Sequence, residues 1–220
     1  MHKNTTLAVF IFLFLILISN KSTAQFKLGA SVGLNSTSFG GVAPENANYS
    51  SIYGFNGSLL VDFKIVNDVY LSLQPGYQSA GSNINFGNEN NIFNDTVKTY
   101  KIQMGYFSIP LNLKIYHKNL YVGGGFISGF LISSTVTNEF TGEETDIKEK
   151  FKSFDMQWNF NVGYKVSLGK PDLFFELRYL QGLININDVN SYSSIESENN
   201  YLSNFKNKGF SLITGILYPL

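Results

Sequence analysis

Few side chains in this sequence could form a catalytic or metal-binding centre. The chain of 220 residues has no cysteine and two histidines, His2 and His117. A serine nucleophile needs a neighbouring base, usually histidine, and thiolate catalysis or thiolate metal binding needs cysteine. His117 lies in the short segment 117–119 between two apolar stretches, where we predict a solvated turn. We therefore predict that the protein is not an enzyme and has no catalytic residue, no metal site and no cofactor.

The charged residues inside the apolar stretches indicate a structural role. Glu176 and Arg178 are two positions apart, as are Asp62 and Lys64, and in a β-strand such side chains point to the same face. Charges enclosed in a narrow barrel must be paired or hydrated, because an isolated buried ion is costly. On this basis we predict a structural polar network in a barrel lumen. Its members are Asp62, Lys64, Lys114, Lys165, Glu176 and Arg178. The side chains of Lys27 and Asp155 are also predicted to face this lumen.

The elements that must position these charges alternate between apolar and polar residues. Residues 154–168 are the clearest case, with Trp158 and Val162 on one face and Asn159 and Asn161 on the other. This period of two is typical of β-strands. The same alternation predicts strands at 26–35, 53–65, 69–78, 99–116, 120–133, 154–168, 173–181 and 209–220.

The predicted connections alternate in length. Segments 66–68, 117–119 and 169–172 are tight turns, and the other four links run to roughly fifteen to twenty-five residues. An up-and-down arrangement then places the short turns and both termini at one end and the long loops at the other, as in outer-membrane barrels. Only 15% of the residues are charged, which fits a lipid-facing exterior. The predicted fold is therefore all-β, an eight-stranded antiparallel up-and-down transmembrane β-barrel with short periplasmic turns and long extracellular loops.

Two details of the pattern carry further predictions. Within 99–116 the apolar set changes phase near Tyr106, which predicts a β-bulge there caused by one extra residue. Tyrosines near the predicted strand ends indicate aromatic girdles at the membrane boundaries. The predicted girdle residues are Tyr70, Tyr116, Tyr121 and Tyr218 beside the short turns, and Tyr53, Tyr77 and Tyr179 toward the loops.

The first residues resemble a secretory signal peptide. Met1–Lys3 is a short basic start, 7–18 is an uninterrupted apolar run, and Ser22 and Ala24 are small residues before Gln25. The apolar run is shorter than the roughly twenty residues that a membrane-spanning helix needs. We predict cleavage after Ala24, which divides the chain into a signal peptide at 1–24 and one barrel domain at 25–220. The predicted location is the cell outer membrane.

Three segments resemble the PorT-like outer-membrane β-barrel family of Gram-negative envelopes. The most specific is the strand that contains Tyr106, Ile109, Pro110, Leu111 and Lys114, similar to the family's Tyr-x-x-Ile-Pro-Leu-x-x-Lys strand. Residues 120–125 are similar to the glycine-rich strand that follows, and 176–183, with Arg178 and Tyr179, resemble the Glu-x-Arg-Tyr strand. The resemblance implies an eight-stranded outer-membrane barrel, and it implies a role in secretion or assembly of surface proteins for the founding members of the family.

The C-terminus resembles the signal that the barrel assembly machinery recognises. Gly215, Tyr218 and Leu220 fit a Gly-x-x-aromatic-x-hydrophobic ending, although Leu replaces the commoner Phe at the last position. The predicted partners are therefore outer-membrane lipid, the barrel assembly machinery, and envelope or surface proteins that contact the loops. Nucleic acid is excluded, since 16 basic residues balance 16 acidic ones.

The long loops are the expected place of function. Segment 135–153 mixes acidic residues with lysines, and 184–208 is rich in Asn and Ser. We predict a non-enzymatic integral outer-membrane barrel that is structural, binds at the surface, or assists secretion or assembly of surface proteins. Two alternatives stay open at this point. One is a secreted soluble barrel of the lipocalin type, whose apolar faces point inward around an apolar ligand. The other is a narrow gated channel.

Overall fold

Antiparallel β-strands account for most of the described chain. The structure is a computed structural model that describes residues 26–43, 46–87, 98–187 and 205–220. The predicted signal peptide and its cleavage site lie outside the described residues. None of the described residues form a helix with the length and hydropathy that a membrane crossing requires. The elements are β1 (Phe26–Gly41), β2 (Ala47–Ser50), β3 (Ile52–Val66), β4 (Val69–Leu73), β5 (Gly76–Phe86), β6 (Lys98–His117), β7 (Leu120–Asn138), β8 (Glu144–Asp146), the short 3-10 helix η1 (Lys148–Lys150), β9 (Phe154–Ser167), β10 (Asp172–Gly182) and β11 (Phe205–Pro219).

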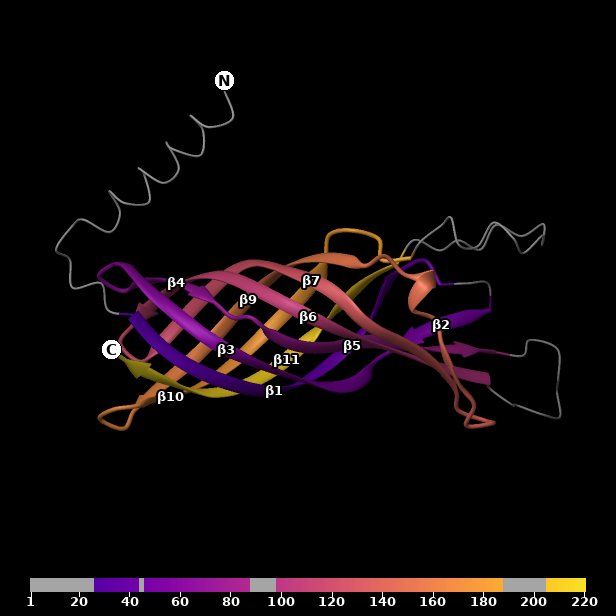
Figure 1. Cartoon of the computed structure of the whole chain (residues 1–220), viewed down its shortest axis with the longest axis horizontal. Coiled ribbons are helices and arrows are strands. Elements are labelled where there is room, and N and C mark those ends of the chain that lie inside the picture. The colour runs from indigo at the N-terminus through magenta and orange to yellow at the C-terminus, as the bar shows by residue number, and fades with distance from the viewer. Residues whose placement is uncertain (1–25, 44–45, 88–97, 188–204) are drawn as a thin grey trace, which may run out of the picture.

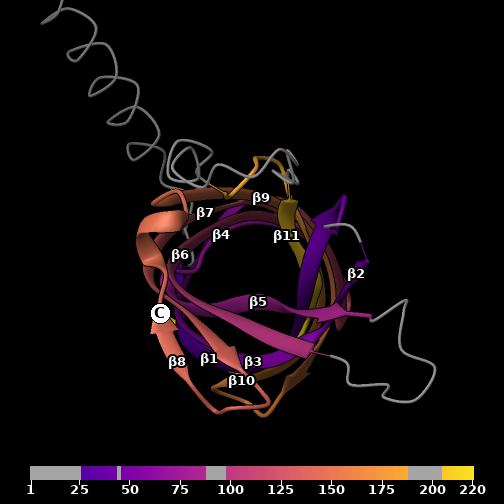
Figure 2. The ribbon, with the colours of Figure 1, turned by 90° about the vertical axis from the view of Figure 1, so that its right-hand side faces the viewer.

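The sheet closes on itself into a ring of 8 strands. The first strand, β1, pairs with β3 on one side and with β11 on the other, from Lys27 opposite Pro219 to Gly41 opposite Phe205. Around the ring the order is β1, β3, β4 with β5, β6, β7, β9, β10 and β11. Figures 1 and 2 show the long tilted barrel from the side and from one mouth. The predicted eight-stranded antiparallel barrel is confirmed.

Tight turns join the strands at one end, which we call the short-turn end. Asn67 in the β3–β4 turn has a φ angle of 31°, and Lys118 in the β6–β7 turn has a φ angle of 56°. Gly169, between β9 and β10, has a φ angle of 95°. Asn and Gly accept this left-handed conformation readily, which is why polar turn residues fall here. The start of β1 and the end of β11 pair at the same end. The predicted positions of the short turns and of the two barrel ends are confirmed.

The opposite end, the loop end, differs from the prediction because the strands continue into segments predicted as loops. β1 runs to Gly41, β7 runs to Asn138, and β2 and β8 add edge strands to β5 and β7. We call this part the loop-end extension. It comprises β2, β8, η1, residues 183–187, and the parts of β1, β5, β6, β7 and β11 at 38–41, 79–86, 98–105, 131–138 and 205–208.

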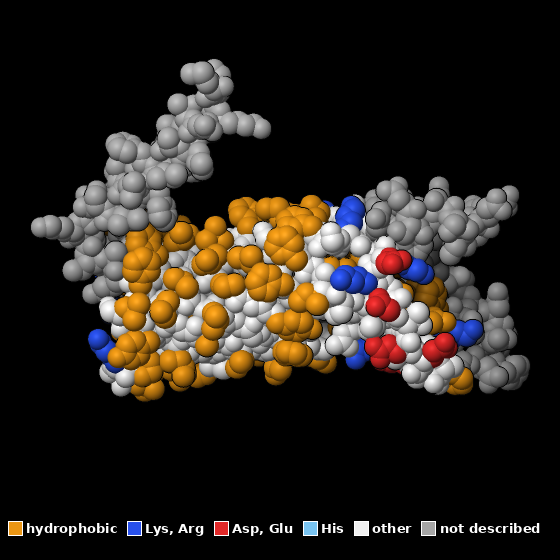
Figure 3. All heavy atoms as spheres, viewed as in Figure 1, with side chains coloured by type: hydrophobic (Ala, Val, Ile, Leu, Met, Phe, Trp, Pro, Cys, Tyr) orange, Lys and Arg blue, Asp and Glu red, His pale blue; other side chains and the backbone are white. Residues whose placement is uncertain are grey.

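Side chains around the barrel waist form an apolar outer surface, which we call the apolar belt (Figure 3). Its residues point outward and stay exposed, and they include Val32, Leu34, Leu59, Leu113, Val122, Val162, Leu177, Leu212 and Ile216. At the same level the lumen is lined by buried polar side chains. The soluble barrel alternative is therefore wrong, because it needs the apolar faces to point inward.

The faces exchange their character in the loop-end extension. Ile102, Met104 and Tyr106 of β6 point inward and join a buried apolar cluster, while Gln103 between them is exposed. The cluster contains Phe39, Ala80, Ile102, Met104, Tyr106, Leu131, Ile147, Phe151, Ile186 and Phe205. This extension core is apolar inside and polar outside, like a water-soluble protein.

The phase change near Tyr106 therefore has a different cause from the predicted one. A register shift does lie there, since Gly105 faces Ser133 whereas Tyr106 faces Leu131. However, the extra residue is Ile132 on β7, and β6 itself alternates without interruption. The apolar set of β6 changes phase because the strand passes from the apolar belt into the extension, where the inner face is the apolar one.

Three of the predicted girdle tyrosines are also placed differently. Tyr70, Tyr116 and Tyr121 are buried inside the short-turn end of the lumen. The ring centroids of Tyr70 and Tyr116 are 5.2 Å apart, and those of Tyr116 and Tyr121 are 4.9 Å apart. Tyr53 and Tyr218 do point outward, with 83% and 49% of their surface exposed. Tyrosine suits both places because it carries an apolar ring and a polar hydroxyl, so its type alone could not decide the face.

The strand predicted at 69–78 is two strands, and the second one leaves the barrel wall. Pro75 has no N–H to donate to a ladder, and the break between β4 and β5 lies at residues 74–75. Beyond Gln78 the loop-end part of β5 crosses the mouth of the barrel (Figure 2). The run Ser79, Ala80, Gly81 and Ser82 is buried at every position.

Small residues permit this crossing. A Cβ atom on Gly54 of β3 would lie 1.7 Å from Ser79 Oγ and 3.1 Å from Ser79 Cβ, so a larger residue at position 54 would displace the Ser79 side chain. Side chains of β1 bond to the crossing strand, since Asn35 Nδ2 donates to Ser79 O at 2.9 Å and Thr37 Oγ1 donates to Gly81 O at 3.2 Å. The crossing strand therefore covers the lumen from the loop end.

Candidate functional site

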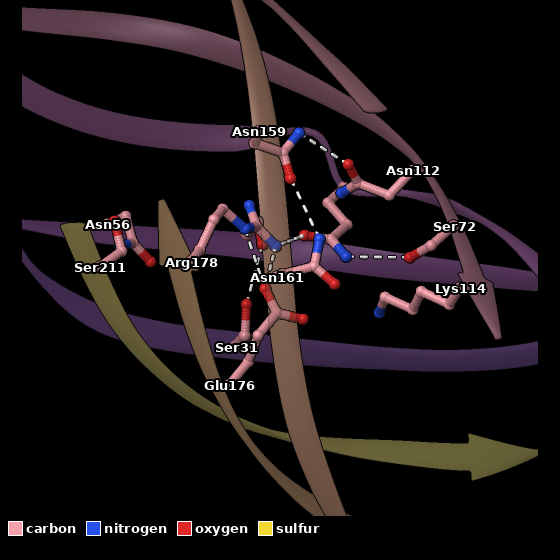
Figure 4. Close-up of polar contacts among 12 residues, drawn as sticks. Ser31, Asn56, Ser72, Asn112, Lys114, Asn159, Asn161, Glu176, Arg178 and Ser211 are labelled. Carbon is pink, nitrogen blue, oxygen red and sulfur yellow. Dashed lines mark hydrogen bonds and ion pairs between the residues drawn. The ribbon is translucent and has the colours of Figure 1, made fainter. Parts of the chain in front are cut away.

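The lumen at the level of the apolar belt is the largest assembly of charged and amide side chains in the described residues, and Figure 4 shows its central part. Inward-pointing positions of β1, β3, β4, β6, β9, β10 and β11 supply it, because alternate residues of each strand face the lumen. Ten of its members are labelled in Figure 4, and they are Ser31, Asn56, Ser72, Asn112, Lys114, Asn159, Asn161, Glu176, Arg178 and Ser211.

Glu176 and Arg178 form the centre of this network. Arg178 Nε donates to Glu176 Oε1 at 2.9 Å, and Nη2 of the same guanidinium donates to Gln74 Oε1 at 2.7 Å. The other carboxylate oxygen of Glu176 accepts a 2.7 Å bond from the Tyr121 hydroxyl. Gln74 in turn donates to Ser72 Oγ at 2.9 Å. The ion pair is thus supported by two neutral partners, Tyr121 on β7 and Gln74 in the break between β4 and β5, as a buried ion pair requires.

A second ion pair lies deeper and is less well bonded. Lys114 Nζ is 3.8 Å from Asp62 Oδ2, and both side chains have no exposed surface. The ammonium lies 5.3 Å from the centroid of the Tyr121 ring and 5.7 Å from that of Phe174. Neither Lys114 Nζ nor the Asp62 oxygens have a hydrogen-bond partner among the described residues. The cation is therefore held by one carboxylate and by aromatic faces.

A row of amides crosses the lumen beside these pairs. Asn161 Nδ2 donates to Asn159 Oδ1 at 3.0 Å, and Asn159 Nδ2 donates to Asn112 Oδ1 at 2.7 Å. Glycine at 163 makes room for Tyr121, whose ring atoms would lie 2.1 Å from a Cβ atom there. The lumen is filled by side chains on all sides at this level, as expected for eight strands.

The lumen contains a small polar cavity beside the Glu176–Arg178 pair. It has a volume of about 20 Å³ and lies between Asn56, Gln74, Gln78, Arg178 and Ser211. That volume holds about one water molecule, for which polar partners are present.

A third charged group closes the short-turn end. Asp172 Oδ2 lies 3.3 Å from both Lys27 Nζ and Lys165 Nζ, and Ser167 Oγ donates to Asp172 Oδ1 at 2.8 Å. The Lys27 ammonium also faces the ring of Tyr70 at 5.2 Å. The tyrosines predicted for the outer girdle therefore line the ionic mouth of the lumen.

The loop end of the lumen is closed by both polar and apolar groups. Asn207 Nδ2 donates to Asp155 Oδ2 at 2.9 Å and to the Tyr106 hydroxyl at 3.2 Å, and Gln157 donates to the same Asp155 oxygen at 2.7 Å. The extension core lies above this layer, with Phe39 stacked on Phe205 at 4.5 Å. Water that enters from the loops therefore meets an apolar layer first.

The structure brings together most of the residues predicted for the polar network. Glu176 and Arg178 form one pair, Lys114 and Asp62 form another, and Lys165 joins the short-turn group. Lys64 is half-buried at the end of β3, and it forms no ion pair with the residues that the structure describes.

Sequence reasoning missed three important members. Tyr121 was assigned to the outer girdle, Asp172 was assigned to a turn, and Gln74 lies where Pro75 interrupts the alternation. The spacing of Gln74 two residues after Ser72 was the available signal for one of them, since both side chains point inward.

The residues of the family motif lie partly in the lumen and partly on the outer surface of the barrel. Tyr106 and Lys114 point into the lumen, Pro110 is buried, Ile109 is half-buried and Leu111 is exposed on the belt. Tyr179 lies on the outer surface between Trp158 and Phe210. Of the predicted assembly signal, Gly215 faces Phe174 in the lumen, while Tyr218 and Leu220 are exposed. Recognition by the assembly machinery stays a prediction.

These features, an apolar exterior and an ionic interior in a closed antiparallel ring, are those of a membrane barrel. A family model described as "Outer membrane protein beta-barrel domain" matches residues 19–188. The chain belongs to this outer-membrane β-barrel family. The family supports an outer-membrane location, so the short-turn end is periplasmic and the loop-end extension is extracellular.

Several solved outer-membrane proteins are similar to this chain at low sequence identity. Neisserial surface protein A is 11% identical, covers 89% of this chain and 97% of its own, and has a TM-score of 0.44. OprG from Pseudomonas aeruginosa is 10% identical, with coverage of 90% and 96% and a TM-score of 0.47. Ail, the attachment invasion locus protein of Yersinia pestis, is 9% identical, with coverage of 89% and 99% and a TM-score of 0.43. No curated protein matches the sequence.

The placement of His117 bears on catalysis. It is an exposed residue at the end of β6, in the periplasmic turn. Among the described residues, no group of three or more His, Cys, Asp or Glu side chains could hold a metal ion. The carboxylates of the lumen are instead bonded to lysine, arginine, tyrosine and amide groups of the barrel wall.

Proposed function

We propose that this protein is a closed, non-enzymatic outer-membrane barrel that acts through its extracellular loop-end extension by binding a partner at the cell surface. The observation that carries the proposal is the inversion of the strands above the apolar belt. A barrel that only crosses the membrane needs no second apolar core beyond it. The extension core, built around Phe39 and Phe205, supports a firm extracellular sheet instead of free loops.

The outer face of that sheet offers hydrogen-bonding groups. Asn85 of β5 donates to Asn48 Oδ1 at 3.0 Å and to Ser50 Oγ at 2.9 Å, and Thr99 of β6 donates to Asn85 Oδ1 at 3.0 Å. The register places polar residues in rows across β2, β5, β6, β7 and β8. The outward positions are Asn48, Ser50, Asn83, Asn85, Thr99, Lys101, Gln103, Thr135, Thr137, Glu144 and Asp146.

Closure of the lumen supports a binding role over a channel. An ion that crossed would have to pass the Asp172 group, the Glu176–Arg178 network and then the extension core, which are formed by buried and partly buried side chains. The gated-channel alternative requires rearrangement of each of these layers.

Two experiments test the proposal. In a planar lipid bilayer, the purified protein should show no stable conductance, whereas regular channel openings would contradict a closed barrel. In the native envelope, a photo-crosslinking amino acid at Thr135, on the outer face of the extension, should give defined protein or saccharide adducts. The same group at Leu177, on the apolar belt, is the matched control and should react only with lipid. Equal adduct patterns at the two positions would contradict binding by the extension.

The narrower PorT-like affiliation is also a proposal, supported by the Tyr106–Lys114 motif and by the 176–183 segment. It implies a role in secretion or assembly of surface proteins. Deletion of the gene should then reduce the amount of specific proteins on the cell surface and increase it in the periplasm. An unchanged surface proteome would contradict this role and would leave the binding proposal intact.

A further inference from the structure

Two lysines stand directly above the aromatic edge of the apolar belt on β11. Lys206 and Lys208 alternate with the buried residues Phe205, Asn207 and Gly209, so both side chains point outward. Neither ammonium forms an ion pair or hydrogen bond with any residue that the structure describes. Unpaired cations two positions apart on one face repel each other, and a bound anion would relieve that repulsion.

The wall beneath the two lysines is shaped by glycines. The Lys208 side chain lies over Gly40 of β1, where a Cβ atom would meet its Cδ at 3.1 Å. The Lys206 side chain lies beside Gly182 of β10, where a Cβ atom would meet its Cβ at 2.9 Å. The aliphatic stems therefore lie close to the barrel wall on either side of β11, and the charged ends are left for a ligand outside it.

Neighbouring strands extend this patch with neutral polar groups. Lys208 lies opposite Ser38 of β1 and opposite Gln181 of β10 in the ladder, and their side chains share its outward face. The Tyr179 hydroxyl donates to Gln181 Oε1 at 2.9 Å. An ammonium, a hydroxyl and an amide thus lie in one row across three strands.

An aromatic cluster adjoins this row, with Tyr179 and Phe210 two positions closer to the apolar belt and Trp158 opposite Gln181 in the row itself. The Tyr179 ring is 5.5 Å from Trp158 and 5.1 Å from Phe210, with tilted or edge-on geometry. Aromatic side chains of this kind occupy the boundary between hydrocarbon and headgroups. Along the wall, Tyr179 and Phe210 therefore come first, then the row of Trp158, Gln181, Lys208 and Ser38, and then Lys206. This order suits the acyl chains and the phosphorylated sugar of an outer-leaflet glycolipid.

We propose that Lys206 and Lys208, with Ser38 and Gln181, form a binding site for the phosphorylated sugar headgroup of an outer-leaflet glycolipid of the lipid A class. The lysines bind the phosphate, the Ser38 hydroxyl and Gln181 amide bind the sugar, and Trp158, Tyr179 and Phe210 contact the first part of the acyl chains. The site is extracellular because it lies on the loop-end side of the apolar belt. It is independent of the surface partner proposed above.

Native mass spectrometry of the purified full-length barrel tests this site. The protein is incubated in detergent with bisphosphorylated lipid A or with chemically dephosphorylated lipid A. The unmodified protein should retain the bisphosphorylated form preferentially, and the K206Q/K208Q variant should bind it about thirtyfold more weakly, because each lysine at an anionic surface contributes about a fivefold step.

Matched variants separate the site from general charge effects. K98Q/K152Q removes two exposed extracellular lysines elsewhere and should bind like the unmodified protein, and K206R/K208R should also retain binding. A heat-dependent mobility shift on SDS gels shows that each variant is folded. Equal retention of the two lipid forms by the unmodified protein, or equal loss in K98Q/K152Q and K206Q/K208Q, would overturn the proposal.

Discussion

The barrel waist and the loop-end extension are built from the same strands with opposite faces. At the waist, β6 presents Leu113 to the outside and Lys114 to the lumen, whereas above it the same strand presents Gln103 to the outside and Met104 to the interior. The solvent explains the exchange. Around the waist the outer medium is hydrocarbon, so polar groups are satisfied inside, and beyond it the outer medium is water, so apolar groups are buried inside.

The strongest way to break this contrast is to remove the interior of the extension. Phe39→Ala should lower the free energy of unfolding by about 4 kcal/mol, because Phe39 is buried and its stacking partner Phe205 would border a cavity. Phe210→Ala, on the lipid-facing surface, is the matched control and should cost less, because acyl chains fill the space. Denaturant titration of both variants in lipid vesicles measures the difference. Equal losses would show that the extension has no core of its own.

At the waist the corresponding interior change is ionic. Glu176→Leu should cost about 3 kcal/mol, because it leaves the buried Arg178 guanidinium with Gln74 alone and removes the acceptor of the Tyr121 hydroxyl. The double variant E176L/R178L should recover much of this loss, since no unpaired charge remains. The same titration measures both variants, and a double variant less stable than the single one would contradict the pairing argument.

A charge placed on the outer face should distinguish the two media. Leu177→Lys puts an ammonium on the apolar belt and should cost about 2 kcal/mol in vesicles. Thr135→Lys, on the outer face of the extension, should be close to neutral because that surface is in water. The vesicle unfolding assay again gives the result. A similar cost at the two positions would place the membrane boundary higher than the apolar belt indicates.

The smallest effect is expected when an apolar residue replaces a polar one on the outer face of the extension. Gln103→Leu should change the free energy of unfolding by less than about 0.5 kcal/mol, because Gln103 is exposed and buries no partner. Fluorescence or circular dichroism during denaturation gives the value. A stabilisation in vesicles comparable to a buried leucine would mean that lipid reaches β6 at this height.

Much of the barrel could be predicted from the sequence, because alternation, short turns and polar spacing are local signals. The inward direction of the Asp62, Lys114, Glu176 and Arg178 side chains followed from the alternation along each strand, whereas the pairing of Asp62 with Lys114 is visible only in the structure. The change of the inner face of β6 from polar to apolar was interpreted as a bulge in this strand. In the sequence, an apolar set that moves to the other face produces the same pattern as one extra residue. The actual extra residue is Ile132 on β7, and only the pairing of two strands reveals it.

Other features depend on long-range contacts that no local pattern encodes. The crossing of β5 depends on the fit between Ser79 and Gly54 across two strands, and the small residues at 79–82 show no apolar face. Asp172 joins Lys27 through ring closure, although the two residues are far apart in the sequence. Tyr121 lies in the lumen because Gly163 leaves room for its ring.

The pairing of β1 with β11 has a consequence for the order of events in barrel formation. The first strand of the ring must wait for β11, which follows the other strands of the ring in the sequence, and until then the hydrogen-bonding edge of β1 is open. Contacts between such distant segments are slow to form, and open edges favour aggregation. A chain that ends before β11 would therefore be expected to stay unclosed and to be removed by proteolysis. The ring can therefore close only after every strand of the barrel has been delivered to the membrane.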